Sequence, residues 1–209
     1  MLELASAGAK VLQTRSVELA MRFDVPLQVR SSFSDEPGTL VCSEEEVMEL
    51  NVVSGIAFSR DEAKVTVARV KDRPGIAAAI FGPLAGAGIN VDTIVQDISR
   101  DGFTSMTFSC PEDQRALAEK TLHTAQQNGE IEFEELETEN NVAKVSIVGI
   151  GMRSHTGVAK QMFDALASDG VNIKAVTTSE IKLTVLIEQK YLELAVQSLH
   201  DCFELEKLS

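Results

Sequence analysis

Tryptophan is absent from this 209-residue chain, tyrosine occurs once, and only three cysteines are present, Cys42, Cys110 and Cys202. The cysteines are widely separated and form no Cys-x-x-Cys pair, which argues against a zinc knuckle or a dithiol redox motif. We therefore expect reduced, structural thiols, as in a cytoplasmic protein. The three histidines share no metal-ligand spacing, so the sequence predicts no metal site.

Positive charge is also scarce, with 19 basic against 32 acidic residues and a net charge of −13. Such a chain has little positive field to attract a phosphate backbone, so we expect no nucleic-acid partner. No apolar run approaches the roughly 18 residues that a spanning helix needs, so we expect no membrane partner. The first ten residues lack a basic leader followed by an apolar core and do not predict a secretory signal.

Motifs that hold phosphates or perform chemistry are missing as well. Neither the pattern GxxxxGK[ST] nor GxGxxG occurs, and no nucleophile–base pair or metal cluster stands out. The sequence therefore does not indicate a nucleotide site or a free-standing catalyst.

The chain does contain an internal repeat. Gly75 precedes Asn90 by 15 residues, and Gly157 precedes Asn172 by the same interval. Between each pair, apolar residues recur at i, i+4, i+5 and i+8: Ile76, Ile80, Phe81 and Leu84 in one copy, and Val158, Met162, Phe163 and Leu166 in the other. This spacing predicts one apolar face of an amphipathic helix in each copy. Both helices are expected to end at a glycine, and Pro83 is expected to kink the first.

Predicted strands flank these helices in the order strand, helix, strand, strand, helix, strand. The strands that open the copies are Lys64–Val70 and Lys144–Ile150, both rich in β-branched residues. This order predicts two ferredoxin-like βαββαβ units and an α+β fold. The second copy lacks a good fourth strand, whereas Asn51–Ser59 is an apolar strand without a repeat of its own. Because a short sheet edge invites pairing, we expect interleaved domains: a first repeat of residues 62–137, and a second repeat of residues 141–205 completed by 51–59.

Three stretches together resemble the regulatory region of the aspartate kinase family, which consists of tandem ACT domains. They are "KDRPGIAAAIFGPLAGAGINVDTIVQ", "AKVSIVGIGMRSHTGVAKQMFDAL" and "VTTSEIKLTVLI". The stretch "ASAGAKVLQTRSVELAMRFDVPLQVRSSF" resembles the tail of the family's amino-acid-kinase domain. We therefore interpret residues 1–46 as this tail, Ala5–Phe33, followed by a linker, Ser34–Glu46.

The resemblance implies a function as well as a fold. It implies an allosteric region that binds threonine, lysine or both, and so inhibits the conversion of L-aspartate to 4-phospho-L-aspartate. The chain alone is not expected to be catalytic or to hold a cofactor, since ATP and magnesium belong to the kinase domain. The implied partners are a second copy of the chain, or a full-length kinase subunit in a heterotetramer, and the implied location is cytoplasmic.

The turn and helix that begin at Gly75 suggest how an amino acid is held. The N–H groups of Gly75, Ile76 and Ala77 at a helix N-terminus suit a carboxylate. Asp72 and Asp92 are candidates to accept hydrogen bonds from the ammonium group. Asn90 and Gln96 are candidates to shape the pocket for the side chain.

The resemblance implies a larger set of effector-binding positions in both copies. In the first copy they are Asp72, Arg73, Pro74, Gly75, Ile76, Ala77, Asn90, Val91, Asp92 and Gln96. In the second copy they are Val158, Ala159, Asn172, Ile173, Thr178, Ser179 and Glu180. The second copy lacks the Asp and Pro of the first turn, so we expect it to line a shared site between ACT domains.

Simpler roles exist for each of these residues. Asp72 is a suitable helix cap, both asparagines suit turns, and Arg73 and Gln96 suit exposed positions. The whole chain also has alternatives: a free-standing enzyme, a ligand-free ACT assembly module, or a regulatory module of another amino-acid enzyme.

Overall fold

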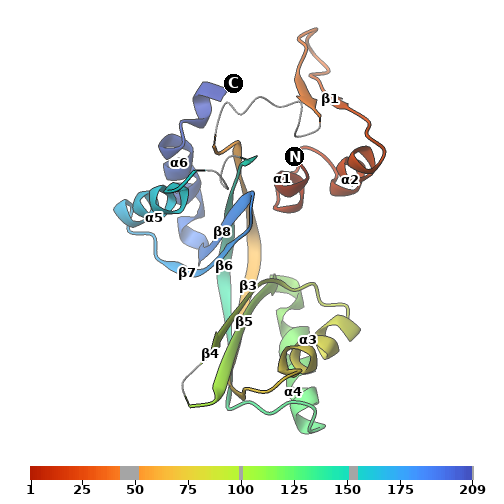
Figure 1. The fold of residues 1–209 in the computed structure, drawn as a ribbon, viewed down its shortest axis with the longest axis vertical. Coiled ribbons are helices and arrows are strands. Elements are labelled where there is room, and N and C mark those ends of the chain that lie inside the picture. The colour runs from red at the N-terminus through yellow and green to blue at the C-terminus, as the bar shows by residue number, and fades with distance from the viewer. Residues whose placement is uncertain (43–51, 99–100, 151–154, 209) are drawn as a thin grey trace.

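The computed structural model describes residues 1–42, 52–98, 101–150 and 155–208. Two lobes share one six-stranded antiparallel sheet, and a smaller N-terminal segment packs beside the upper lobe (Figure 1). The strand order is β4-β5-β3-β6-β8-β7, so the two long central strands, β3 and β6, run through both lobes. Among the described residues, no helix is long and apolar enough to cross a membrane.

The first repeat forms the lower lobe. Its elements are β3 (Gly55–Lys71, shared), α3 (Ile76–Gly86), β4 (Asp92–Ile98), β5 (Phe103–Pro111), α4 (Arg115–Gln127) and β6 (Glu135–Val148, shared). Within this lobe the strands are ordered β4-β5-β3-β6, which is the arrangement of a ferredoxin-like unit. A short 3-10 turn, Glu112–Gln114, precedes α4.

The second repeat forms the upper lobe with the same topology. Its own elements are α5 (Val158–Ser168), β7 (Ile173–Thr178), β8 (Lys182–Glu188) and α6 (Leu192–Cys202). Its first strand is the C-terminal half of β6, and its fourth strand is the N-terminal half of β3, where Gly55–Ser59 pairs with Lys144–Val148. The α+β class and the interleaving of the two units are thus confirmed.

The strand boundaries differ from the predicted ones. Asn51–Ser59 and Lys64–Val70 were expected as separate strands, but Gly55–Lys71 is a single strand of 17 residues. Likewise, β6 begins at Glu135 and continues into the stretch predicted as the first strand of the second repeat. The polar residues 60–62 resemble a turn in the sequence, yet they continue the strand because β6 pairs alongside them with shifts in register.

Each repeat has its own core on the helical face of the sheet. In α3 the buried residues are Ile76, Ile80 and Leu84, and in α5 they are Val158, Met162 and Leu166. The two predicted apolar faces are therefore confirmed. Pro83 lies inside α3 as expected.

Both helices end in the same hydrogen-bonded cap. Gly88 has φ 73° and donates to Ala85 O, while the next N–H, from Ile89, reaches Leu84 O. Gly170, with φ 68°, repeats this arrangement at the end of α5. Only glycine adopts such a conformation without strain, so these two residues fix where the chain leaves each helix.

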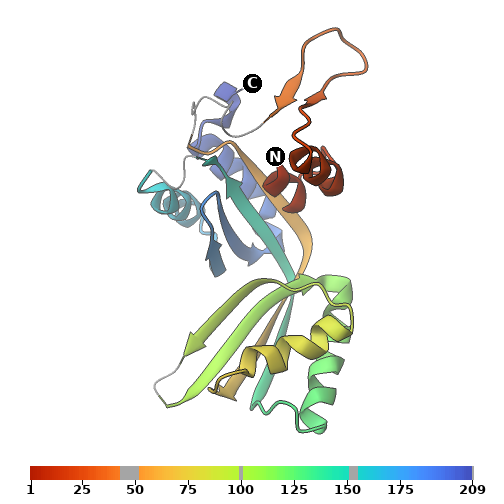
Figure 2. The ribbon, with the colours of Figure 1, turned by 45° about the vertical axis from the view of Figure 1, so that its right-hand side comes forward.

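The lobes meet at the level of Arg60–Glu62 in β3, which we call the waist. Bulges interrupt the β3–β6 pairing between Ser59 and Lys64, and bulges increase the right-handed twist of a strand pair. The coiling brings β4 and β7, which lie at opposite edges of the sheet, into contact. Figure 2 shows both lobes carried on this twisted central pair.

The N-terminal segment contains α1 (Leu2–Ser6), α2 (Thr14–Arg22) and a small hairpin of β1 (Leu27–Val29) and β2 (Thr39–Val41). Strand β2 lies within the stretch interpreted as a linker, so part of that stretch is structured. Residues 43–51, which include the rest of that linker and Asn51, lie outside the described residues.

A candidate effector site at the waist

The two halves of the predicted amino-acid clamp lie at opposite ends of the first repeat. Asp92 pairs with Ser109, which pairs with Lys64, whereas the turn before Gly75 follows Lys71. Along β3, Lys64 marks the height of Asp92 and Lys71 that of the Gly75 turn. The two points are seven residues apart, about 23 Å at 3.3 Å per residue. Helix α3 causes this separation, because it runs back along the sheet between the two points. One amino acid therefore does not reach both halves within a single repeat.

The Gly75 turn itself has an open approach. Gly75 has φ 89°, and no atom lies within 4 Å of where a Cβ would stand. Of the three predicted N–H donors, that of Ile76 donates to Arg73 O at 3.2 Å. Asp72 donates its own N–H to Gly102 O and is exposed, as are Arg73 and Pro74.

The second-repeat positions are divided in the same way. Asn172 and Ile173 lie at the waist end of β7, since Ile173 pairs with Ile187 and through it with Ala143. At the far end of that lobe, the turn after β7 is closed by the N–H of Ser179, which donates to Lys182 O at 2.7 Å. This far end carries the remaining positions: Val158, Ala159, Thr178, Ser179 and Glu180.

A cavity of about 330 Å³ lies at the waist. It is lined by Ser6, Ala7, Gly8, Ser59, Glu62, Asn90, Val91, Asp92, Cys110, Pro111 and Lys144. Three of these, Asn90, Val91 and Asp92, are predicted effector positions. Its volume lies at the lower end of the usual range for small-molecule sites, which suits a ligand the size of an amino acid.

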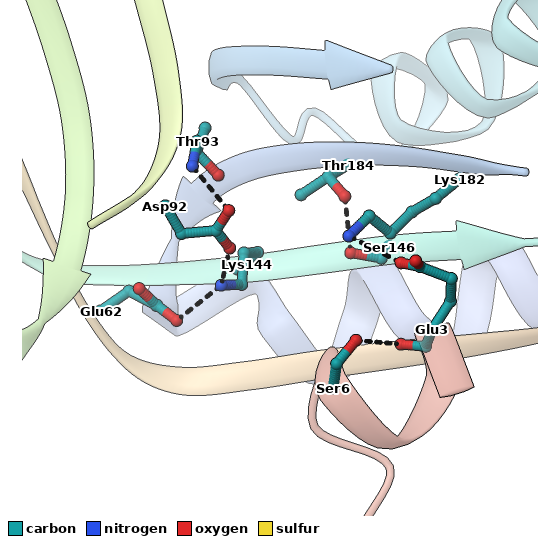
Figure 3. A network of polar contacts seen from close by, with 9 residues as sticks. All are labelled: Glu3, Ser6, Glu62, Asp92, Thr93, Lys144, Ser146, Lys182 and Thr184. Carbon is teal, nitrogen blue, oxygen red and sulfur yellow. Dashed lines mark hydrogen bonds and ion pairs between the residues drawn. The ribbon is translucent and has the colours of Figure 1, made fainter. Parts of the chain in front are cut away.

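A buried lysine connects two carboxylates in this cavity (Figure 3). Lys144 Nζ lies 2.7 Å from Asp92 Oδ2 and 3.1 Å from Glu62 Oε1. The side chains of Lys144 and Glu62 are only 12% and 9% exposed, whereas that of Asp92 is 55% exposed. The other oxygen of Asp92 accepts from the N–H of Thr93 at 2.8 Å. Lys144 thus links β4 of the first repeat to the part of β6 that belongs to the second.

The charges of this pair stabilise each other. Partial burial opposes ionisation of Asp92, but the hydrogen bond and positive charge of Lys144 outweigh it and lower the pKa of Asp92. Burial likewise opposes the charge on Lys144, yet the hydrogen bond from Lys144 to Asp92 and the charge of Glu62 raise its pKa. Both groups are therefore ionised at neutral pH.

Cys110, the remaining titratable residue of the lining, adds no charge. Burial, and then the nearby charge of Glu62, raise the pKa of Cys110 to about 11. The charged groups that line the cavity are therefore Glu62, Asp92 and Lys144, which leaves one negative charge in excess.

The second repeat has the opposite charge at the matching position. Asn90-Val91-Asp92 corresponds to Asn172-Ile173-Lys174, so a lysine replaces the aspartate. Lys174 forms an ion pair with Glu139, which also pairs with Lys64 at 3.2 Å. An ammonium acceptor is thus present in the first copy and replaced by a cation in the second.

The N-terminal segment forms one wall of the cavity. Ser6 is the last residue of α1, and Ala7 and Gly8 follow it. Helix α1 is held by an ion pair of 3.0 Å between Glu3 and Lys182 (Figure 3). Gly8 has φ 115°, and a Cβ there would lie 2.1 Å from the carbonyl oxygen of Phe58. Close contact with β3 therefore requires glycine at this position.

The remaining predicted residues have local partners. The side chain of Gln96 donates to Thr104 Oγ1 at 3.2 Å, and the N–H of Asn90 donates to Gln114 Oε1 at 2.9 Å. These contacts position the β4 edge and its preceding turn.

Sequence reasoning missed Glu62, Lys144 and the Ser6–Gly8 wall. Lys144 and Asp92 are 52 residues apart in sequence, so no local pattern joins them. A signal did exist for Lys144, which is a charged residue within an otherwise apolar strand sequence that is expected to be buried. Glu62 gave none, because it lies in the polar run of residues 59–62.

Comparisons with known proteins agree with this architecture. Two sequence profiles, both described as ACT domain, match residues 64–125 and 145–203. The chain is 53% identical over 207 residues to an aspartate kinase of Pseudomonas fluorescens, covering 99% of this chain and 50% of that one. The chain thus spans about half the length of the curated relatives it matches.

Solved structures show the same relationship. A structure described as aspartokinase alpha and beta subunits shares 42% identity with a TM-score of 0.67, covering 73% of this chain and 99% of that one. Aspartokinase III of E. coli, in complex with lysine and aspartate, shares 27% identity with a TM-score of 0.72, covering 97% of this chain and 44% of that one. Taken with the interleaved repeats, these similarities show that the chain belongs to the aspartate kinase family, as a regulatory region of two ACT domains.

Proposed function

We propose that this chain is the effector-binding part of an aspartate kinase and that an end-product amino acid binds in the waist cavity. Threonine is the first candidate and lysine the second. Binding inhibits the phosphorylation of L-aspartate to 4-phospho-L-aspartate, the first step toward lysine, threonine and methionine. ATP and magnesium are held elsewhere, by the kinase domain.

One observation carries this proposal: the waist cavity has walls from both ACT domains and from the kinase-like N-terminal segment. Asp92 offers a half-exposed carboxylate for an ammonium, and Asn90 lies beside it. Ser6–Gly8 forms the opposing wall, so a ligand in the cavity touches the segment that leads toward the kinase domain. Regulation through this contact requires an equilibrium between two arrangements of the chain, one of which inhibits the kinase. A ligand shifts that equilibrium only by its difference in affinity for the two arrangements.

A second copy, or a full-length kinase subunit, is the proposed partner. The Gly75 turn and Asp92 are about 23 Å apart along the strand direction, too far for one amino acid to join within a repeat. Strands β4 and β7 are the two edges of the sheet, and an edge is where another ACT domain adds. An ACT domain placed beside β4 brings a Gly75 turn from another chain to the Asp92 end.

Calorimetric titration of the chain with single amino acids tests the proposal. We expect saturable binding of threonine or lysine, with a raised thermal midpoint because the ligand binds the native state. Asp92→Ala should weaken binding about 5- to 150-fold, equivalent to a loss of about 1–3 kcal/mol. A ligand-free assembly module would show neither binding nor a shift in its melting temperature with any amino acid.

A further inference from the structure

We propose that Lys144 occupies the ammonium position of the waist cavity when no effector is bound, and that an effector displaces it from Asp92. This inference rests on the proposed function, since it concerns how the same cavity recognises its ligand. It makes Lys144 an internal competitor of the effector.

Both oxygens of Asp92 are already occupied. Oδ1 accepts from the N–H of Thr93 at 2.8 Å, and Oδ2 contacts Lys144 Nζ at 2.7 Å. An effector ammonium that approaches Asp92 meets another ammonium at the same oxygen. Two ammonium groups at one oxygen repel each other, so the effector competes with Lys144 for Oδ2.

Lys144 has a second partner that makes its departure feasible. Glu62 lies 3.1 Å from Lys144 Nζ and is only 9% exposed, so the lysine keeps a buried counter-ion when it moves away from Asp92. Without Glu62, release of Lys144 would leave a buried charge unpaired, which is strongly unfavourable. Glu62 is therefore the residue that allows the exchange.

The charge of the cavity favours the exchange as well. Its charged lining consists of two carboxylates and one lysine, so the excess negative charge attracts the ammonium group of an effector. After the exchange, Asp92 pairs with the effector ammonium and Glu62 pairs with Lys144.

The exchange changes the contact between the two ACT domains. Asp92 starts β4 of the first repeat, whereas Lys144 lies where β6 pairs with Ser59 and Leu186 of the second repeat. Their contact is one of the ion pairs that join the lobes at the waist. Effector binding replaces this internal link by a ligand contact, and so biases the relative arrangement of the lobes.

Calorimetric titration of the whole chain with threonine and with lysine tests the inference, because the variants are expected to change the affinity in opposite directions. Lys144→Met removes the competitor and should tighten binding of whichever amino acid the wild type binds, within the roughly 5- to 150-fold range of a coupling free energy. Glu62→Gln removes the alternative partner, holds Lys144 at Asp92, and should weaken binding. Lys174→Met removes the matching lysine of the second repeat, which does not line the cavity, and should leave affinity unchanged.

Lys144→Arg provides a test that keeps the buried cation. A guanidinium holds carboxylates with two hydrogen bonds, so it should compete more strongly and weaken binding. Unchanged or weaker binding by Lys144→Met overturns the inference, as does unchanged or tighter binding by Glu62→Gln. Should Lys144→Met not fold, unchanged or tighter binding by Lys144→Arg overturns it. A wild-type chain that binds neither amino acid refutes the proposed function and the inference together. If the wild type binds but the variants change the affinity in the directions opposite to those expected, the inference alone is refuted.

Discussion

Asp92→Asn tests how much the ion pair at the waist stabilises the fold. The substitution keeps the shape of the side chain and removes the charge that faces Lys144 at 2.7 Å. Exposed ion pairs contribute about 0–1 kcal/mol, and breaking a buried one costs about 3–5 kcal/mol. Asp92 is 55% exposed, which screens the pair, and Lys144 retains Glu62. We therefore expect a loss of about 1–2 kcal/mol at pH 7.

The same variant has a defined pH dependence. The pKa of Asp92 in the folded chain lies below its ordinary value of 3.8, so its contribution to stability is present above that value. The contribution is lost as the pH falls from the ordinary value through the lowered pKa, because in that range the unfolded state binds more protons than the folded one. The difference between wild type and Asp92→Asn should therefore be largest at neutral pH and shrink below about pH 4.

Urea unfolding at several pH values measures this difference, and thermal melts should show a shift of about 2–8 °C at pH 7. Glu193→Gln is the control, because its ion pair with Arg60, at 3.1 Å, is a surface contact whose side chains are 84% and 50% exposed. It should cost no more than about 0.5 kcal/mol. Equal losses in the two variants, or a loss for Asp92→Asn that persists in acid, would refute the reasoning.

Three further predictions concern the fold around the site. Leu166→Ala leaves a cavity in the core of the second repeat, where this side chain is fully buried, and should cost about 2–5 kcal/mol in urea unfolding. Gly8→Ala places a Cβ against the Phe58 carbonyl at 2.1 Å, so it should release the N-terminal segment and speed tryptic cleavage after Lys10, with little change in the main melting transition. Cys110 is fully buried with a pKa of about 11, so thiol reagents at pH 8 should modify the exposed Cys202 first, and labelling of Cys110 at an equal rate would contradict the described core.

Much of the fold follows from local patterns. The spacing of Ile76, Ile80 and Leu84 predicts a helix face because a helix repeats every 3.6 residues, and the structure buries those residues. The donation of Gly55–Ser59 to the second repeat follows from counting strands, since one repeat has a strand too few and another strand lacks a repeat.

The long central strands and the site depend on information that local patterns do not hold. Arg60–Glu62 resembles a turn by composition, and only pairing with β6 keeps it extended. The Gly75 turn and Asp92 are close in sequence, yet the helix between them sends them to opposite ends of the sheet. Lys144 reaches Asp92 because the sheet coils at the waist. That coiling arises from the irregular pairing of β3 with β6, and the sequence of either strand alone does not reveal how the two pair.

The most direct test of regulation is an assay of aspartate phosphorylation by a full-length aspartate kinase subunit, with and without this chain, over a range of threonine and lysine concentrations. The chain alone, given ATP and aspartate, should show no turnover, because it lacks the motifs that position phosphates. Its addition should change the amino-acid concentration at which the kinase subunit is half inhibited. Turnover by the isolated chain, or a sensitivity that is the same with and without it, would contradict the account.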